Sequence, residues 1–259
     1  MVGRLRILNQ PAFVLHQRAY SETSLLLDMF TRNHGRIAVI AKGAKQKKSR
    51  TRGILLPFQP LIVAWTGRGD VKTLTGAETL LPRKLFQREV LFCGYYINEL
   101  ILRLLHRYDP HEALFDTYER ALDLLTEEAD LERILRIFEK RLLQDVGYGL
   151  QLEREPENGD EIQPAKIYRY LVDIGPIIEE AQDGVGIQVH GESLRALEKE
   201  ELFTPLHRRE LKQLTRAVLD LHLEGRTLNS RMVYSRLFLT QSAHMKSTPQ
   251  EFVEKGGIC

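Results

Sequence analysis

The 259-residue chain is 43% hydrophobic and 28% charged, a composition that excludes a disordered protein and suits one or two folded domains. Its two cysteines, Cys93 and Cys259, exclude a disulfide framework and a four-cysteine zinc site. The net charge of +2 conceals an asymmetry: residues 1–84 hold 15 basic and four acidic residues (+11), and the remainder holds 22 and 31 (−9).

We expect no signal peptide and no membrane-spanning segment in this sequence. The first residues lack the apolar run of a signal peptide. No segment approaches the roughly 20 apolar residues of a membrane helix. We therefore expect a soluble protein of the reducing cytoplasm.

The N-terminal part of the chain is predicted to consist of short strands. Residues 11–20, 24–31, 35–43, 58–67 and 70–78 are apolar or alternating segments separated by turn formers. Segment 24–31 alone is equally compatible with a helix. Five short strands with a long polar loop after the third are typical of a small antiparallel barrel, and the oligonucleotide-binding (OB) fold is the leading candidate.

The hydrophobic pattern becomes helical after residue 84. Apolar residues recur at spacings of three and four over 90–108, 112–125 and 130–146. A polar, acidic stretch at 153–164 is predicted to be a loop or linker. Two strand-like segments follow it, at 167–180 and 184–191, and then helical segments at 193–202, 207–225 and 230–239.

These patterns predict an α+β protein. It begins with a five-stranded OB-fold barrel and continues into a mainly helical domain that carries a small irregular or β insertion. The predicted boundaries are a barrel over 1–82, a helical domain over 83–150, an insertion over 151–190, C-terminal helices packing on the helical domain over 191–240, and a polar tail over 241–259.

A long window of the barrel lacks acidic residues. None occurs between Met29 and Gly69, a stretch of 41 residues with nine Lys or Arg. Such density suits phosphate contacts, which give affinity without sequence preference. The alternative is a merely solvated loop or a targeting-like basic run. The candidate nucleic-acid contacts are Arg32, Arg36, Lys42, Lys45, Lys47, Lys48, Arg50, Arg52 and Arg68, with Lys72 beyond the window.

Three barrel aromatics are weaker candidates for stacking on bases. Phe30, Phe58 and Trp65 are available, but bulky side chains in a small barrel more often fill its core. The third helical segment places Arg133, Arg136 and Lys140 on one face at helical spacing, beside apolar residues. That pattern suits an acidic peptide with a hydrophobic anchor, although spacing alone favours an ordinary amphipathic helix.

Enzyme motifs are missing from the chain. It has no Walker-type GxxxxGK[ST], GxGxxG, HExxH or GxSxG sequence and no carboxylate pair in a basic segment. The eight histidines are scattered and predict no metal site. We expect neither catalysis nor a cofactor. The alternatives are an RNA-binding OB protein of translation or RNA processing and, less favoured, a nuclease or nucleotidyl transferase.

The order of several motifs resembles the RecO family of bacterial recombination mediators. The similarity lies in FVLHQRAYSETSLLLDMFT, GRIAVIAKGAKQKKS, PFQPL with GRGDVKTL, YYINELI and VGYG, and it resumes weakly at LNSRMVYSRLF. The resemblance implies an OB domain, a helical domain and a C-terminal extension that in some members binds zinc through four cysteines. This chain has no cysteine in that region, so the resemblance assigns it a zinc-less insertion.

The resemblance also implies a function. Family members bind single- and double-stranded DNA, anneal strands coated with single-stranded-DNA-binding protein (SSB), and with RecR help to load RecA. It implies DNA contact by the loop from Lys42 to Arg52 and contact of Arg136 with the acidic SSB tail. Lys140 and Arg141 join this tail site by proximity. A nucleoid-associated, non-enzymatic protein of recombinational repair is the resulting prediction.

Overall fold

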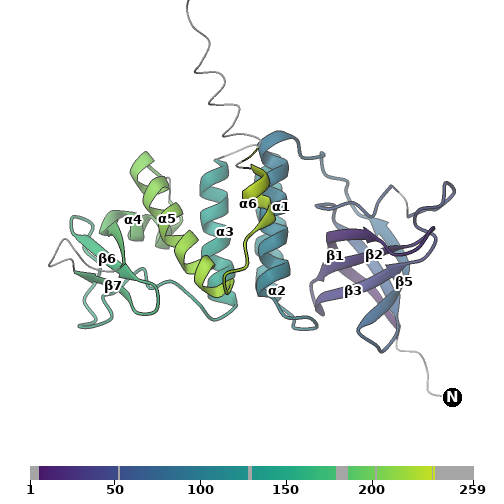
Figure 1. Cartoon of the computed structure of the whole chain (residues 1–259), viewed down its shortest axis with the longest axis horizontal. Coiled ribbons are helices and arrows are strands. Elements are labelled where there is room, and N and C mark those ends of the chain that lie inside the picture. The colour runs from purple at the N-terminus through teal and green to yellow at the C-terminus, as the bar shows by residue number, and fades with distance from the viewer. Residues whose placement is uncertain are drawn as a thin grey trace, which may run out of the picture.

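The computed structural model describes residues 6–51, 53–127, 130–178, 186–201, 203–234 and 236. A five-stranded barrel, a group of helices and a small three-stranded sheet follow one another along the long axis of the molecule (Figure 1). The predicted α+β class and the five-stranded barrel are confirmed. The predicted unit boundaries stay a prediction, and the polar tail over 241–259 lies outside the described residues.

The barrel strands close in the order β1-β2-β3-β5-β4, and β3 and β5 are the parallel pair. Two bulges, between Ile7 and Gln10 and between Val14 and His16, let the long first strand pair with β4 at its start and β2 at its end. The segment 24–31, which a helix could also have fitted, forms strand β2. The strands are β1 (Arg6–Ala19), β2 (Leu25–Thr31), β3 (Gly35–Ala41), β4 (Leu61–Thr66) and β5 (Val71–Thr79).

One side of the barrel is covered by helices, so part of β1 is buried on both faces. Val14 points into the barrel core with Met29 and Trp65. Phe13 points outward, and its ring lies 5.4 Å from Phe115 and 5.1 Å from Tyr118. The covering helices are α1 (Arg88–Leu104) and α2 (Glu112–Thr126), followed by α3 (Leu131–Asp145).

Hydrogen bonds fix the helices to the barrel at the same place. Buried Asn98 of α1 donates from Nδ2 to the carbonyl of Leu15 at 2.9 Å, and its Oδ1 accepts from the Tyr118 hydroxyl at 2.7 Å. Burial raises the pKa of Tyr118, so the hydroxyl remains a donor. A buried amide with both ends satisfied makes this contact specific as well as apolar.

The turn between β2 and β3 meets the end of the α1–α2 connection. Gly35 has φ +61°, and a Cβ there would lie 1.9 Å from the carbonyl oxygen of Asp109. Gly43 has a similar φ of +70°, but a Cβ there would meet only the Gln46 side chain, at 3.5 Å. The two glycines therefore share a backbone conformation and differ in the space around them.

Replacing Gly35 by alanine is expected to lower the free energy of unfolding by about 3 kcal/mol, because left-handed strain adds to a backbone clash. Gly43→Ala, the matched control, is expected to lose only about 1 kcal/mol, from the strain alone. Denaturant unfolding of both variants measures the difference. Equal losses would show that the β2–β3 turn does not press against Asp109 in solution.

The remaining elements form a small sheet and three helices. Strands β6 (Ile167–Leu171), β7 (Gly175–Ile178) and β8 (Ile187–His190) pair in the order β7-β6-β8. Helices α4 (Gly191–Lys199) and α5 (Pro205–His222) pack against α3, and α6 (Asn229–Tyr234) packs against α1. Figure 1 shows the sheet at the end of the molecule opposite the barrel.

The polar loop before β6 is held by hydrogen bonds. The Glu155 carboxylate is buried, and it accepts from the Tyr168 hydroxyl at 3.0 Å and from Asn158 Nδ2 at 2.9 Å. The Tyr168 hydroxyl in turn accepts from the Gln163 amide at 2.9 Å. In the described part of the chain, no group of three or more His, Cys, Asp or Glu side chains is placed to hold a metal ion. The hydrogen bonds among Glu155, Asn158, Gln163 and Tyr168 link this loop to β6.

Candidate nucleic-acid interface

The basic loop, residues 42–51, lies at the end of the barrel away from the helices. It follows Ala41 at the end of β3, whereas the start of β3 at Gly35 meets Asp109. Seven strand residues separate these two ends by about 20 Å. Figure 1 shows the helices on one side of the barrel, away from the end at which β3 finishes.

Hydrogen bonds fix the base of the loop, and its cationic side chains are exposed to solvent. Lys45 anchors it, because its amide donates to the Thr23 carbonyl at 2.9 Å and its Nζ to the Ser21 carbonyl at 3.0 Å. Ala44 is buried beneath. The side chains of Lys42, Lys47, Lys48 and Arg50 are exposed, and none has a polar partner within the described residues. A fixed, unpaired cationic surface of this kind suits a polyanion.

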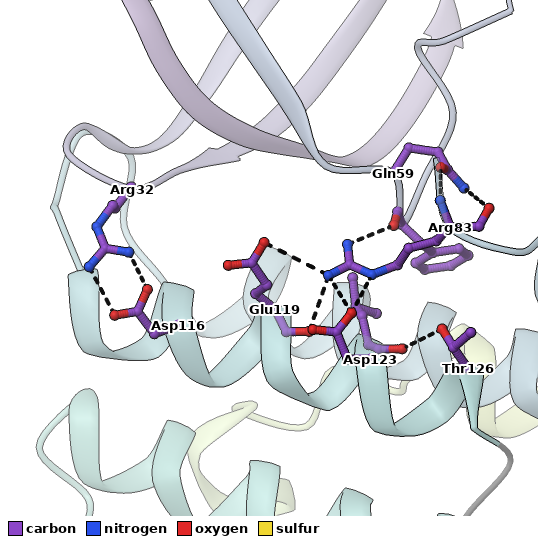
Figure 2. Close-up of polar contacts among 9 residues, drawn as sticks. Arg32, Gln59, Arg83, Asp116, Glu119, Asp123 and Thr126 are labelled. Atoms are coloured by element: carbon purple, nitrogen blue, oxygen red, sulfur yellow. Dashed lines mark hydrogen bonds and ion pairs between the residues drawn. The ribbon is translucent and has the colours of Figure 1, made fainter. Parts of the chain in front are cut away.

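Arg32 faces the helices. Its guanidinium forms a two-pronged ion pair with Asp116 of α2 (Figure 2). It also approaches Glu112 at 3.9 Å. The hydrogen bonds and charge of Asp116 raise the pKa of Arg32. Arg36 is half-buried and donates to the Leu102 carbonyl, and burial lowers its pKa. Both predicted contacts therefore join the barrel to the helices in this structure.

Arg83 completes this joint and was not predicted. Its guanidinium lies 2.8 Å from Asp123 and 3.8 Å from Glu119. Gln59 holds the Arg83 backbone, accepting from its amide at 2.8 Å and donating to its carbonyl at 3.1 Å. Figure 2 shows Arg32 and Arg83 reaching one face of α2. That face carries an acidic stripe, Glu112, Asp116, Glu119 and Asp123.

The three remaining predicted contacts, Lys72, Arg68 and Arg52, lie outside the described basic loop. Lys72 donates to the Gly69 carbonyl at 2.8 Å, and its Nζ lies 4.7 Å from the centre of the Tyr108 ring. Arg68 is exposed in the β4–β5 turn and has an interaction of its own. Arg52 lies outside the described residues. The cations with the freest access are therefore those of the basic loop.

The three barrel aromatics lie in the interior of the protein, where bulky side chains of a small barrel are most often found. Trp65 lies in the barrel core, Phe30 packs on Phe115 at 5.3 Å, and Phe58 stacks on Phe86 at 4.9 Å. All three are buried. None of the three rings is therefore open to stacking by a base.

An open depression borders the basic loop and adds a cation that the sequence did not single out. Arg18 is exposed near the end of β1 and lies outside the acid-free window. The sequence carried no signal that set Arg18 apart from the other exposed residues at the end of β1. The depression is lined by Gln17, Arg18, Ala19, Leu25, Ala44, Lys45 and Leu56.

The predicted tail-binding residues on α3 all have partners. Arg136 is 8% exposed, and its guanidinium lies 2.5 Å from the Glu139 carboxylate, which accepts from the Tyr96 hydroxyl at 2.7 Å. Lys140 and Arg141 both pair with Glu200 at the end of α4, at 3.1 and 2.7 Å. Burial opposes ionisation of Glu200, but the hydrogen bonds from Arg141 and Lys140 lower its pKa.

The chain matches two family models in succession. The model described as "Recombination protein O N terminal" covers residues 5–83, and "Recombination protein O C terminal" covers residues 85–232. A DNA repair protein RecO of Methylococcus capsulatus is 45% identical over 229 residues, 88% of this chain and 93% of the relative. One of Nitrosococcus oceani is 42% identical over 233 residues, 90% and 95% of the two chains.

A more distant relative supports the same match. The DNA repair protein RecO of Coxiella burnetii is 40% identical over 226 residues, 87% of this chain and 97% of the relative. Among the described helices, none is long and apolar enough to cross a membrane.

Proposed function

This chain belongs to the RecO family, and on that premise we propose that it is a DNA-binding protein of recombinational repair. It binds single- and double-stranded DNA, anneals complementary strands coated with SSB, and with RecR helps to load RecA. The observation that carries the DNA contact is the basic loop, whose unpaired cations stand at the end of the barrel remote from the helices.

Annealing follows from charge neutralisation. Two complementary strands repel each other through their phosphates, and a cationic surface lowers the barrier to their encounter. Base pairing supplies the free energy, so no nucleotide hydrolysis is required. The protein holds strands together without chemistry, a role that places it with chromosomal DNA.

Docking on SSB is proposed for α3. Arg141 is exposed where α3 meets the end of α4 and pairs with Glu200. Lys140 lies beneath it, largely buried, and holds Glu200 together with the carbonyls of Leu197 and Glu198. An acidic tail that docks here exchanges its carboxylates for that of Glu200. Arg136 stands behind this surface in its buried pair with Glu139. Its part in tail binding rests on the resemblance.

Annealing of SSB-coated oligonucleotides without ATP is the direct test. The protein is expected to accelerate pairing of labelled complementary strands, followed by energy transfer between their dyes. SSB that lacks its acidic tail serves as the control, because tail docking is then removed and phosphate neutralisation is kept. Binding without faster pairing would contradict the annealing role. Tighter binding to RNA than to DNA of equal length would favour the RNA-binding alternative.

A further inference from the structure

The depression beside the basic loop lies at the end of β1 that extends past its pairing with β4. Strand β1 pairs with β4 only from Arg6 to Ala12, and one isolated bridge joins Val14 to Pro57. From His16 to Ala19, the described pairing of β1 is with β2 alone. The depression therefore opens between the free edge of β1 and the segment that leads into β4.

The lining of the depression matches the two parts of a nucleotide. Ala19, Leu25 and Leu56 give apolar surface above the buried Ala44, which suits the face of a base. Arg18 and Lys45 add cations, which suit the phosphates on either side of it. Apolar surface next to unpaired positive charge is typical of sites for single-stranded nucleic acid.

An exposed aromatic residue adjoins the depression in the chain. Tyr20 is 59% exposed in the turn between β1 and β2, directly after the depression residue Ala19. This turn is tied to the basic loop by the two hydrogen bonds from Lys45 to Ser21 and Thr23. Tyr20 thus sits at the junction of the free strand edge and the unpaired cations, unlike the buried Phe30, Phe58 and Trp65.

We propose that this depression receives an unpaired base of single-stranded DNA, with Tyr20 as a stacking surface for a base and with Arg18 and Lys45 on the adjoining phosphates. The inference rests on the proposed DNA binding and adds a site that distinguishes single-stranded from duplex DNA. In a duplex the bases are paired and stacked inside, so only the phosphate contacts remain. Annealing therefore withdraws bases from Tyr20 and weakens the hold on the product.

The affinities of Tyr20→Ala for single-stranded and duplex DNA of equal length test the proposal. Loss of one base–aromatic stack is expected to weaken single-strand binding roughly 5- to 150-fold. Duplex affinity and the salt dependence of binding are expected to stay unchanged. Tyr20→Phe keeps the ring and should bind as the native protein does. Tyr148→Ala removes a 47% exposed tyrosine from the far part of the molecule and should leave both affinities unchanged.

The outcomes separate this site from the general function. If the native protein binds no DNA, the proposed function fails. If it binds but Tyr20→Ala leaves single-strand affinity unchanged, or weakens both forms equally, the stacking site alone is overturned. A single-strand oligonucleotide carrying 2-aminopurine gives a second reading, because its fluorescence should be quenched by the native protein and by Tyr20→Phe more than by Tyr20→Ala.

Discussion

Replacing Lys45, Lys47, Lys48 and Arg50 together by glutamine is expected to weaken binding of single-stranded DNA on the order of 10²- to 10³-fold near 0.1 M salt. Each cation that neutralises a phosphate releases condensed counterions. Four lost contacts should lower the slope of log affinity against log salt by about 3 for a single strand. The four side chains are exposed. Glutamine at position 45 loses the Nζ hydrogen bond to Ser21 but keeps the amide hydrogen bond to Thr23 that ties the loop to the β1–β2 turn, so the fold should be little affected.

The matched control removes the same charge from the opposite part of the molecule. Lys199, Arg209, Lys212 and Arg216 are exposed on α4 and α5, and their replacement by glutamine should change neither the affinity nor the slope appreciably. Fluorescence anisotropy over a range of salt concentrations measures both quantities. Equal losses in the two variants would show that net charge, and not the loop, carries binding. Glutamate at the four loop positions should also abolish annealing.

Two of the motifs on which the predicted fold rests contact each other in the structure. Asn98 of the YINEL motif donates to the carbonyl of Leu15 in FVLH, so two segments far apart in the chain are constrained together. Alternation predicted the barrel strands, but residues 12–15 are all buried. Strand periodicity could not show this, because it says nothing of the helices that cover the outer face.

The residues of the candidate site could be predicted only where their setting depends on nearby sequence. The basic loop could be predicted because an acid-free run has no local partner with which to pair. Arg32 shares that run, but its partner Asp116 comes 84 residues later, and no window of sequence brings the two together. Arg18 and Tyr20 were missed because their setting also depends on distant segments. The edge of β1 beside them is free only because β4 pairs with the start of β1 and not with its end.

Helical spacing similarly placed Arg136 on a charged face, yet the structure places it inside. Replacing Arg136 by alanine is expected to cost about 3–5 kcal/mol of unfolding free energy, because Glu139 then stays buried without its cation. Tyr96, whose hydroxyl binds Glu139, contributes one remaining hydrogen bond. Chemical denaturation measures the loss. Stability within about 1 kcal/mol of the native protein would contradict the burial of this pair.

A double variant separates the charge from the packing. Arg136→Met with Glu139→Leu removes both charges and keeps apolar volume, and such replacements of buried pairs are often neutral or stabilising. This variant should recover most of the stability lost by Arg136→Ala. Recovery without binding of an SSB-tail peptide would assign Arg136 a direct part in that binding. Recovery with native peptide affinity would make Arg136 a purely structural residue.

The roles of Lys140 and Arg141 in tail binding are tested by removing the carboxylate that pairs with both. Glu200→Gln removes the carboxylate shared by Lys140 and Arg141, although Lys140 keeps its hydrogen bonds to the carbonyls of Leu197 and Glu198. Tail-peptide affinity should rise roughly 2- to 10-fold, mainly because the partly exposed Arg141 is freed. Glu201→Gln is the matched control, since Glu201 pairs only distantly with Lys199, at 3.9 Å. Because both changes add one unit of net charge, a general electrostatic gain would appear in both. An increase confined to Glu200→Gln would place the acidic tail on Lys140 and Arg141, and an unchanged affinity would move it elsewhere on the helices.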